Sequence, residues 1–236
     1  IAFLFPYDSE IIASLATHYN GANQPGRAEE VAKNYISQCD STNLYVNKEY
    51  AYSLFMQFKY DEAIPLYEKL IAQGFDNFES NFVLGLCYEN QPNKEEALKH
   101  YQKAVQFKSD NATCLFHLAL AEKALNMDSL SMAHFNQSLE VSLPKDRALR
   151  TYKWLADLHF QHSRYADAAR DFELCILYDE EDDPLNYYNA AQMFIASKNK
   201  LKAKQHLQLF LANTNRLEDK KEAAQLISKA KEQLKQ

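Results

Sequence analysis

Two histidines three residues apart are the first side chains in this sequence that could do chemistry. His159 and His162 could share a zinc ion, because neutral imidazole is a common ligand of that metal. No glutamate stands between them, as it does in the H-E-x-x-H helix of zinc proteases, so the pair lacks a general base. His159 also falls on a position that faces the interior of the helix pair described below. We therefore interpret it as a core residue and predict neither a metal nor a cofactor.

An acidic run, 179–183, could attract a cation. Calcium loops space their oxygen ligands around a central glycine, and this run has neither the spacing nor the glycine. We therefore interpret it as a solvated loop between helices. Catalytic arrangements are equally absent, since no Ser–His–Asp or Cys–His set can be recovered from the spacing. We expect a protein that is not an enzyme.

Glycine usage excludes several further classes of function. The 236 residues include only four glycines, Gly21, Gly26, Gly74 and Gly85. Dinucleotide-binding loops, phosphate loops and nucleophile elbows need glycine at fixed offsets, because the backbone there approaches a ligand or turns at positive φ. The four glycines form no such pattern. Few glycines together with fifteen Tyr and fourteen Phe favour closely packed helices joined by short turns.

Charge and hydropathy limit the classes of partner that we expect for this chain. The formal net charge is −6 and no basic stripe stands out, which argues against a nucleic-acid surface. No apolar run approaches the ~20 residues of a membrane-spanning helix. We therefore expect a protein or peptide as the partner, with self-association as a further possibility.

The compartment is left open by the sequence. The four cysteines lack C-x-x-C spacing and are interpreted as small buried residues, which favours a reducing, cytoplasmic environment. The apolar start, residues 1–6, is too short for the core of a signal peptide. Because the chain begins with Ile rather than Met, we expect an upstream segment. An exported or periplasmic location therefore stays possible.

One pattern recurs five times and indicates the architecture. A small residue is followed four positions later by a bulky one, and the pattern returns at spacings of 34, 34, 37 and 35 residues. The small residues are Ala63, Ala97, Ser131, Ala168 and Ala203, and the bulky ones are Tyr67, Tyr101, Phe135, Phe172 and Leu207. Twelve positions before each small residue stands another: Ala51, Gly85, Ala119, Ala156 and Ala191. Small residues let two antiparallel helices approach closely while a neighbouring ring fills the gap.

These residues resemble the tetratricopeptide repeat, a 34-residue helix pair with small residues at its eighth and twentieth positions and an aromatic at its twenty-fourth. The resemblance implies an all-α fold, a right-handed α-solenoid of stacked antiparallel helix pairs. We assign five repeats to 44–217, namely 44–77, 78–111, 112–145, 149–182 and 184–217, with Asp146-Arg147-Ala148 as additional residues. Residues 1–43 are expected to form a divergent helix pair, and 218–236 a capping helix. The family's usual proline near the repeat end is missing from every copy.

In this family the first helices of successive repeats line a concave groove, and the resemblance implies which side chains face it. They are Tyr45, Lys48, Tyr52, Phe55, Phe82, Leu86, Phe116, Leu120, Arg150, Lys153, Phe160, Tyr188 and Gln192. Among them, Tyr52, Phe82, Phe116, Phe160 and Tyr188 would form an aromatic stripe with one ring per repeat. Contact of such a stripe with water is unfavourable by about 25 cal/mol per Å², so it usually marks an interaction site.

The sequence therefore predicts a non-enzymatic scaffold that binds a peptide or helix of another protein in an aromatic-lined groove. Ring contacts would supply affinity, and Lys48, Arg150 and Lys153 would orient the bound segment. Two alternatives stay open. The chain could be a structural or oligomerisation subunit whose groove face is buried in an assembly, or it could be the regulatory repeat region of a larger protein.

Overall fold

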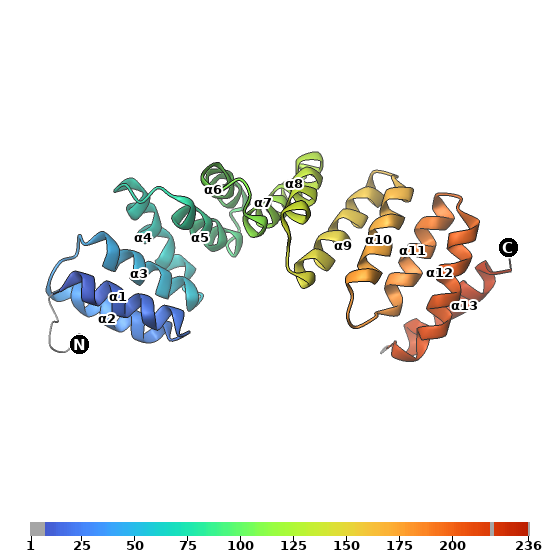
Figure 1. Ribbon diagram of the computed structural model, residues 1–236, viewed down its shortest axis with the longest axis horizontal. Helices are drawn as coiled ribbons and strands as arrows, with labels where there is room; N and C mark the ends of the chain where they lie inside the picture. The colour runs from blue at the N-terminus through green and yellow to red at the C-terminus, as the bar shows by residue number, and fades with distance from the viewer. Residues whose placement is uncertain (1–7, 218–219, 236) are drawn as a thin grey trace. The chain divides into compact units, whose positions relative to one another are not determined.

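The computed structural model describes residues 8–217 and 220–235, and within this part every regular element is a helix (Figure 1). The thirteen α-helices are α1 (Ser9–Gly21), α2 (Pro25–Gln38), α3 (Leu44–Met56), α4 (Tyr60–Ala72), α5 (Phe78–Glu89), α6 (Lys94–Phe107), α7 (Ala112–Ala124), α8 (Asp128–Val141), α9 (Lys145–Gln161), α10 (Tyr165–Tyr178), α11 (Pro184–Ala196), α12 (Lys200–Asn213) and α13 (Lys220–Gln233). A 3₁₀ turn, η1, covers Thr214–Arg216. The all-α prediction is confirmed. The first seven residues of the expected N-terminal pair, and 218, 219 and 236 of the expected capping helix, lie outside the described residues.

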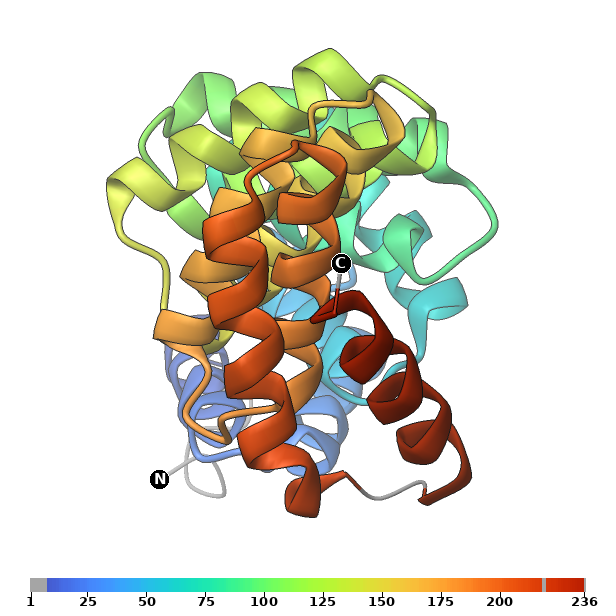
Figure 2. The same cartoon turned by 90° about the vertical axis from the view of Figure 1, so that its right-hand side faces the viewer.

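Contacts between helices divide the chain into two compact units, Ile1–Ser131 and Met132–Gln236, with the boundary inside α8. In the first unit, α1 packs on α2 and α3, and each helix from α2 to α6 packs on the one that follows it. In the second unit, the same holds from α9 through α13. Figure 2 shows the C-terminal end of this unit, where α13 lies beside α12. Packing between consecutive helices is what stacked helix pairs require.

Asparagine and aspartate begin the first helices. The side chains of Asn43, Asn77, Asn111 and Asp183 accept hydrogen bonds from backbone N–H groups in the first turns of α3, α5, α7 and α11. Each bond satisfies a donor that the helix leaves unpaired, at about 1 kcal/mol per cap. These four helices begin at the first residues of four assigned repeats. In contrast, α9 begins at Lys145, because the three additional residues, 146–148, form its first turn.

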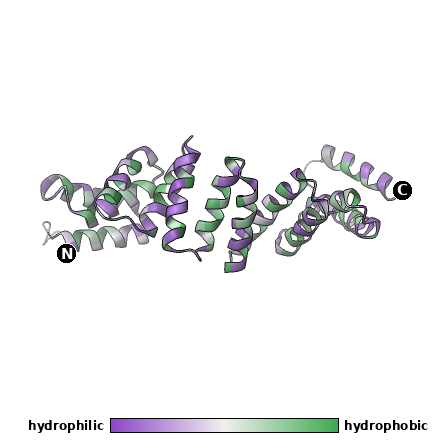
Figure 3. Ribbon diagram, turned by 90° about the horizontal axis from the view of Figure 1, so that it is seen from above, coloured by the Kyte–Doolittle hydropathy of each residue, from purple (hydrophilic) through white to green (hydrophobic). Residues whose placement is uncertain are grey.

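Small residues lie where helices cross. Ala51, Ala119, Ala156 and Ala191 have no exposed surface. Ser131 stands at the twentieth position of its repeat, where the other four repeats have alanine. Its buried hydroxyl donates a hydrogen bond to the carbonyl of Ala119 at 2.8 Å. Since the hydroxyl is satisfied, its burial costs little. The result is a core of apolar faces turned inward, while Figure 3 shows apolar and polar residues sharing most helices.

Gly85 is the one glycine in this series, and the structure shows why. A methyl group added at Gly85 would lie 2.6 Å from Cε1 of Tyr101, well inside van der Waals contact. The Tyr101 ring is fully buried and its hydroxyl donates to the Glu89 carboxylate, so it has little freedom to move aside. Alanine therefore fits at the equivalent crossings but not at this one.

The turns inside the pairs use residues other than glycine at positive φ. Phe58, Asn126, Ser163 and Lys198 have φ between 58° and 62°, and each holds the fifteenth position of its repeat. A left-handed residue of this kind ends the first helix. For side chains other than Asn or Asp the conformation costs about 1–2 kcal/mol, so the scarcity of glycine costs stability here.

We expect Gly85→Ala to lower the free energy of unfolding by about 1–3 kcal/mol, which is the usual cost of over-packing a core. The loss should appear even though alanine favours a helix by about 1 kcal/mol over glycine. In a Tyr101→Leu background, where the shorter side chain leaves room, the same change should become neutral or stabilising. Chemical denaturation followed by circular dichroism measures both. A Gly85→Ala protein at least as stable as the parent would contradict the tight Gly85–Tyr101 contact.

We expect Ser163→Gly to raise the free energy of unfolding by about 0.5–1 kcal/mol. Removing Cβ relieves the left-handed strain, and the greater freedom of glycine in the unfolded chain offsets part of the gain. Ser163→Ala is the matched control, because its methyl group keeps the strain, and it should not be more stable than the parent. Denaturant midpoints compare the two variants. Equal midpoints would show that the strain at this turn is negligible.

Candidate protein-binding surface

The residues expected to face a groove lie on α3, α5 and α7 of the first unit and on α9 and α11 of the second. The structure separates them by exposure. Tyr45, Arg150, Lys153 and Phe160 are exposed; Lys48, Tyr52, Phe55, Phe82, Leu86, Leu120 and Gln192 are half-buried; Phe116 and Tyr188 are buried. Among these predicted residues, the most exposed rings are those of Tyr45, at 67%, and Phe160, at 50%.

Phe116 and Tyr188 are not part of an exposed stripe. They are 2% and 7% exposed, and the Tyr188 ring packs 5.1 Å from that of Phe210 on α12. The expectation of one open ring per repeat is therefore wrong at these two positions. The physical reason is that a ring at helical spacing can fill a gap between helices as readily as it can face water.

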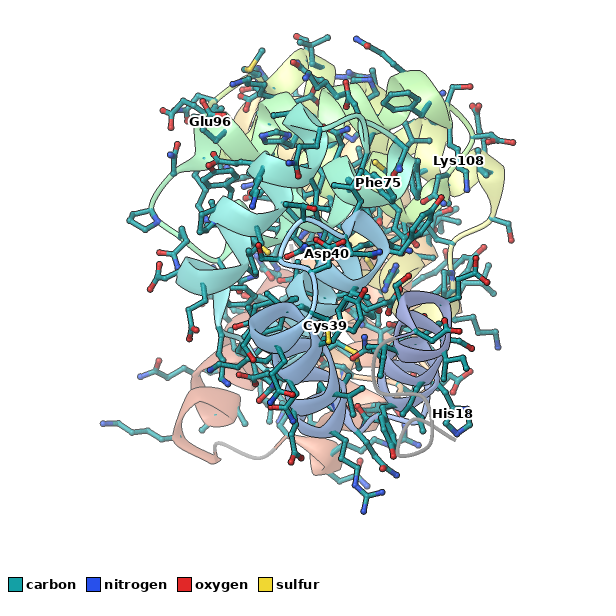
Figure 4. All side chains as sticks on the ribbon, turned by 90° about the vertical axis from the view of Figure 1, so that its left-hand side faces the viewer. His18, Cys39, Asp40, Phe75, Glu96 and Lys108 are labelled. Carbon is teal, nitrogen blue, oxygen red and sulfur yellow. The ribbon has the colours of Figure 1, made fainter. Side chains whose placement is uncertain are left out.

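Phe82 lies in a cluster of rings within the first unit. Its ring stacks on Phe78, 5.5 Å between centroids, and meets His117 edge-on at 5.9 Å. The ammonium of Lys108 stands 4.7 Å above the Phe78 ring, and Figure 4 labels this lysine. These contacts join α5 to α7 and leave Phe82 half-buried, so only part of its surface can meet a partner.

Glu89, which was not among the predicted residues, links two rings of this cluster through its carboxylate. Glu89 accepts a hydrogen bond from the Tyr101 hydroxyl and lies 2.8 Å from Nδ1 of His117. Burial raises the pKa of Glu89, but the bonds from His117 and Tyr101 outweigh it, and the pKa is lowered. Glu89 therefore serves as an ionised internal acceptor. Its partners come from two other helices, so no local spacing in the sequence could have revealed the group.

The charge of Lys48 is already matched. Its Nζ lies 3.1 Å from Glu79 on α5 and 3.6 Å from Glu49. Burial lowers the pKa of Lys48, yet the pairs with Glu79 and Glu49 outweigh it, and the pKa is raised. Beside this pair, the exposed Tyr45 ring meets Phe75 edge-on at 5.4 Å, and Figure 4 labels Phe75. A bound segment would have to displace Glu79 to use Lys48.

The second unit brings two predicted residues to one cleft. A hollow of about 180 Å³ opens between α9 and α11, with Phe172 of α10 among its walls. Lys153 and Phe160 line it from α9, and Asn189 and Met193 line it from α11. Among the described residues, no carboxylate forms an ion pair with Lys153. The cleft thus combines an exposed ring, an amide, the carboxylate of Asp157 and a lysine that pairs with no carboxylate among the described residues, which is a lining that suits binding.

Gln192, also predicted, is engaged within the fold. Its side-chain amide exchanges two hydrogen bonds of 3.0 Å with that of Gln233 on α13. This reciprocal pair fixes the end of α13 against α11. We therefore remove Gln192 from the residues available to a partner.

The residues weighed for metal chemistry have structural roles. His159 is buried, and its Nδ1 lies 2.6 Å from Asp171 of α10, whose pKa is raised by burial. In the acidic run, Asp179 accepts hydrogen bonds from the Asp183 backbone N–H and the Asn186 amide, which close the turn before α11. Within residues 8–217 and 220–235, no group of three His, Cys, Asp or Glu side chains could hold a metal ion.

The cysteines differ from one another. Cys87, Cys114 and Cys175 are buried, and burial raises the pKa of each thiol to about 12, which makes them poor nucleophiles. Cys39 is exposed, contrary to the expectation that all four are buried.

In the part of the chain that the structure describes, no helix is long and apolar enough to span a bilayer.

Comparison with known sequences points to helical-repeat proteins. The family model for anaphase-promoting complex, cyclosome, subunit 3 matches residues 56–128. DnaJ homolog subfamily C member 3 of Gallus gallus is 23% identical over 173 residues, a match covering 70% of this chain and 34% of that protein. The chain thus spans about a third of the length of this curated relative.

Solved structures share the fold at low identity. MamA is 14% identical with a TM-score of 0.63, over 73% of this chain and 92% of MamA. YrrB, described as a TPR protein with an unusual peptide-binding site, is 15% identical with a TM-score of 0.53, over 96% and 95% of the two chains. Together with the small–large residue pattern, these likenesses confirm the resemblance seen in the sequence: the chain has the tetratricopeptide-repeat fold.

Proposed function

We propose that this chain is a non-enzymatic protein-interaction scaffold, and that the cleft between α9 and α11 receives a peptide or helix of another protein. The observation that supports the proposal is the half-exposed ring of Phe160, which stands beside the unpaired Lys153 at this cleft. An aromatic anchor next to a polar group is the usual composition of an energetically dominant contact. YrrB, which shares the fold, is described as having a peptide-binding site, and this adds support.

The Phe160 ring can contribute substantially to binding. A phenylalanine side chain buries about 150–250 Å² in full. Covering the half that is exposed would gain about 2–3 kcal/mol at about 25 cal/mol per Å². Lys153 would meet a carboxylate or carbonyl of the bound segment, and the Asn189 amide could both donate to and accept from its backbone.

The first unit offers a candidate contact surface of its own. Tyr52, Phe55, Phe82 and Leu86 are half-buried on α3 and α5, and we propose them as contact residues, together with exposed Tyr45. Because Tyr52, Phe55, Phe82 and Leu86 are more deeply buried than Phe160, each of the four can gain less from a partner than Phe160 can. Phe160 is therefore the residue on which the test depends.

We expect Phe160→Ala to weaken the binding of peptide ligands by about 30- to 150-fold, the equivalent of about 2–3 kcal/mol. Ligands are obtained by selecting a phage-displayed peptide library on the full chain, and their affinity is measured by fluorescence anisotropy. Leu177→Ala is the matched control, because Leu177 is 75% exposed on α10 of the same unit and does not line the cleft. It should change affinity less than about twofold.

Two results would count against the proposal. Selected peptides that bind Phe160→Ala as tightly as the parent would remove the cleft from consideration. A dimer seen by sedimentation, and lost in Phe160→Ala but not in Leu177→Ala, would instead favour a self-associating structural subunit. Circular dichroism of both variants verifies that the helices remain folded.

A further inference from the structure

A second cleft, with a different lining, lies at the C-terminal end of the second unit. An open cleft of about 420 Å³ lies where the end of α11, the start of α12 and the end of α13 meet. Its size falls within the range of about 300–1,000 Å³ that is usual for ligand sites. It shares no lining residue with the cleft around Phe160.

Aliphatic side chains line the depth of this cleft. Ile195 and Leu234 line it from α11 and the end of α13, and Ala203 and Leu207 of α12 contribute buried surface. Ile195 remains 40% exposed. The reciprocal Gln192–Gln233 amide pair holds the end of α13 against α11, so positioned helices bound the cleft.

The rim of the cleft is basic. Lys198, Lys200 and Lys204 line it, and among the described residues no carboxylate lies within ion-pair distance of any of them. Lys202, the fourth lysine of the run, shows the contrast, because its Nζ is paired with Glu173 of α10 at 2.9 Å. The first turn of α12, which begins at Lys200, adds the partial positive charge of a helix N-terminus.

The stretch that supplies α11, α12 and the lysines of the cleft contains no acidic residue. No Asp or Glu occurs from 184 to 217, although the whole chain carries a formal net charge of −6. A local excess of unpaired lysines on an acidic protein favours a partner of negative charge, and it speeds the encounter with one.

We propose that this cleft binds an acidic peptide segment of a partner protein that carries a large aliphatic side chain. The aliphatic side chain enters the space above Ala203 and Leu207, while neighbouring carboxylates meet Lys198, Lys200 and Lys204. A peptide suits the cleft better than a nucleic acid does, because the lining offers aliphatic surface and no aromatic ring for base stacking.

The proposal is tested with fluorescein-labelled twelve-residue peptides of defined composition, titrated against the full chain. A Glu–Leu alternating peptide should bind saturably. Its Glu–Ser and Gln–Leu counterparts should bind at least tenfold more weakly, because each lacks one of the two chemistries. Spectra of ¹⁵N-labelled protein should show the Glu–Leu peptide shifting amides of 195–207 and 233–234.

Two double variants test whether the lysines that line the cleft bind the acidic peptide. Lys200→Ser/Lys204→Ser should weaken binding of the Glu–Leu peptide at least tenfold. Lys33→Ser/Lys69→Ser, which removes the same charge from exposed lysines of the first unit, should change it less than twofold. Phe160→Ala should leave this affinity unchanged, so that failure here and failure of the proposed function above can be told apart.

Four outcomes would overturn the proposal. They are equal losses in the two double-lysine variants, a Glu–Ser peptide that binds as tightly as Glu–Leu, no saturable binding of the Glu–Leu peptide, and tighter binding of single-stranded oligothymidine than of the peptide at the same lysines. The last result would assign the surface to nucleic acid.

Discussion

The contact between a small residue on one helix and a large side chain on its partner is the interaction on which the rest of this structure depends. It sets how closely each antiparallel pair can approach. In the α5–α6 pair the approach reaches its limit, since Tyr101 leaves no space for a methyl group on Gly85. A single pair cannot bury its own apolar face, so each pair must stack on the next. Because every pair must make this contact, the small–large pattern recurs about every 34 residues.

Close packing also decides which side chains remain for a partner. First helices present rings on more than one side, and a neighbouring helix covers some of them. Tyr188 packs against Phe210 and is withdrawn from the surface, whereas Phe160 keeps half of its surface exposed. Two rings on the first helices of successive repeats thus have opposite roles. The difference lies in the neighbour and not in the ring.

Ionisable side chains serve mainly to join helices. Glu89 bridges from α5 to His117 on α7, and His159 bridges from α9 to Asp171 on α10. Taking such groups out of water is costly, and hydrogen bonds from several directions offset the cost. The lysines around the start of α12 are different: Lys202 is paired with Glu173, but Lys198, Lys200 and Lys204 have no such partner among the described residues. Charged side chains that have no ion-pair partner within the fold remain available to bind a ligand.

Much of the architecture could be predicted from residue types and spacing alone. The recurring small residues and the bulky residues four positions after them predict stacked helix pairs, and the spacing of the glycines fits no cofactor loop. These signals are local, because a helix face is set by residues within a few positions. Only the tertiary structure decided which rings are open, that Lys48 is already paired, and that Lys198, Lys200 and Lys204 line an open cleft with aliphatic walls beside the end of α13. Each of these depends on contacts between helices far apart in sequence, and helical spacing is the same whether a face meets another helix or water.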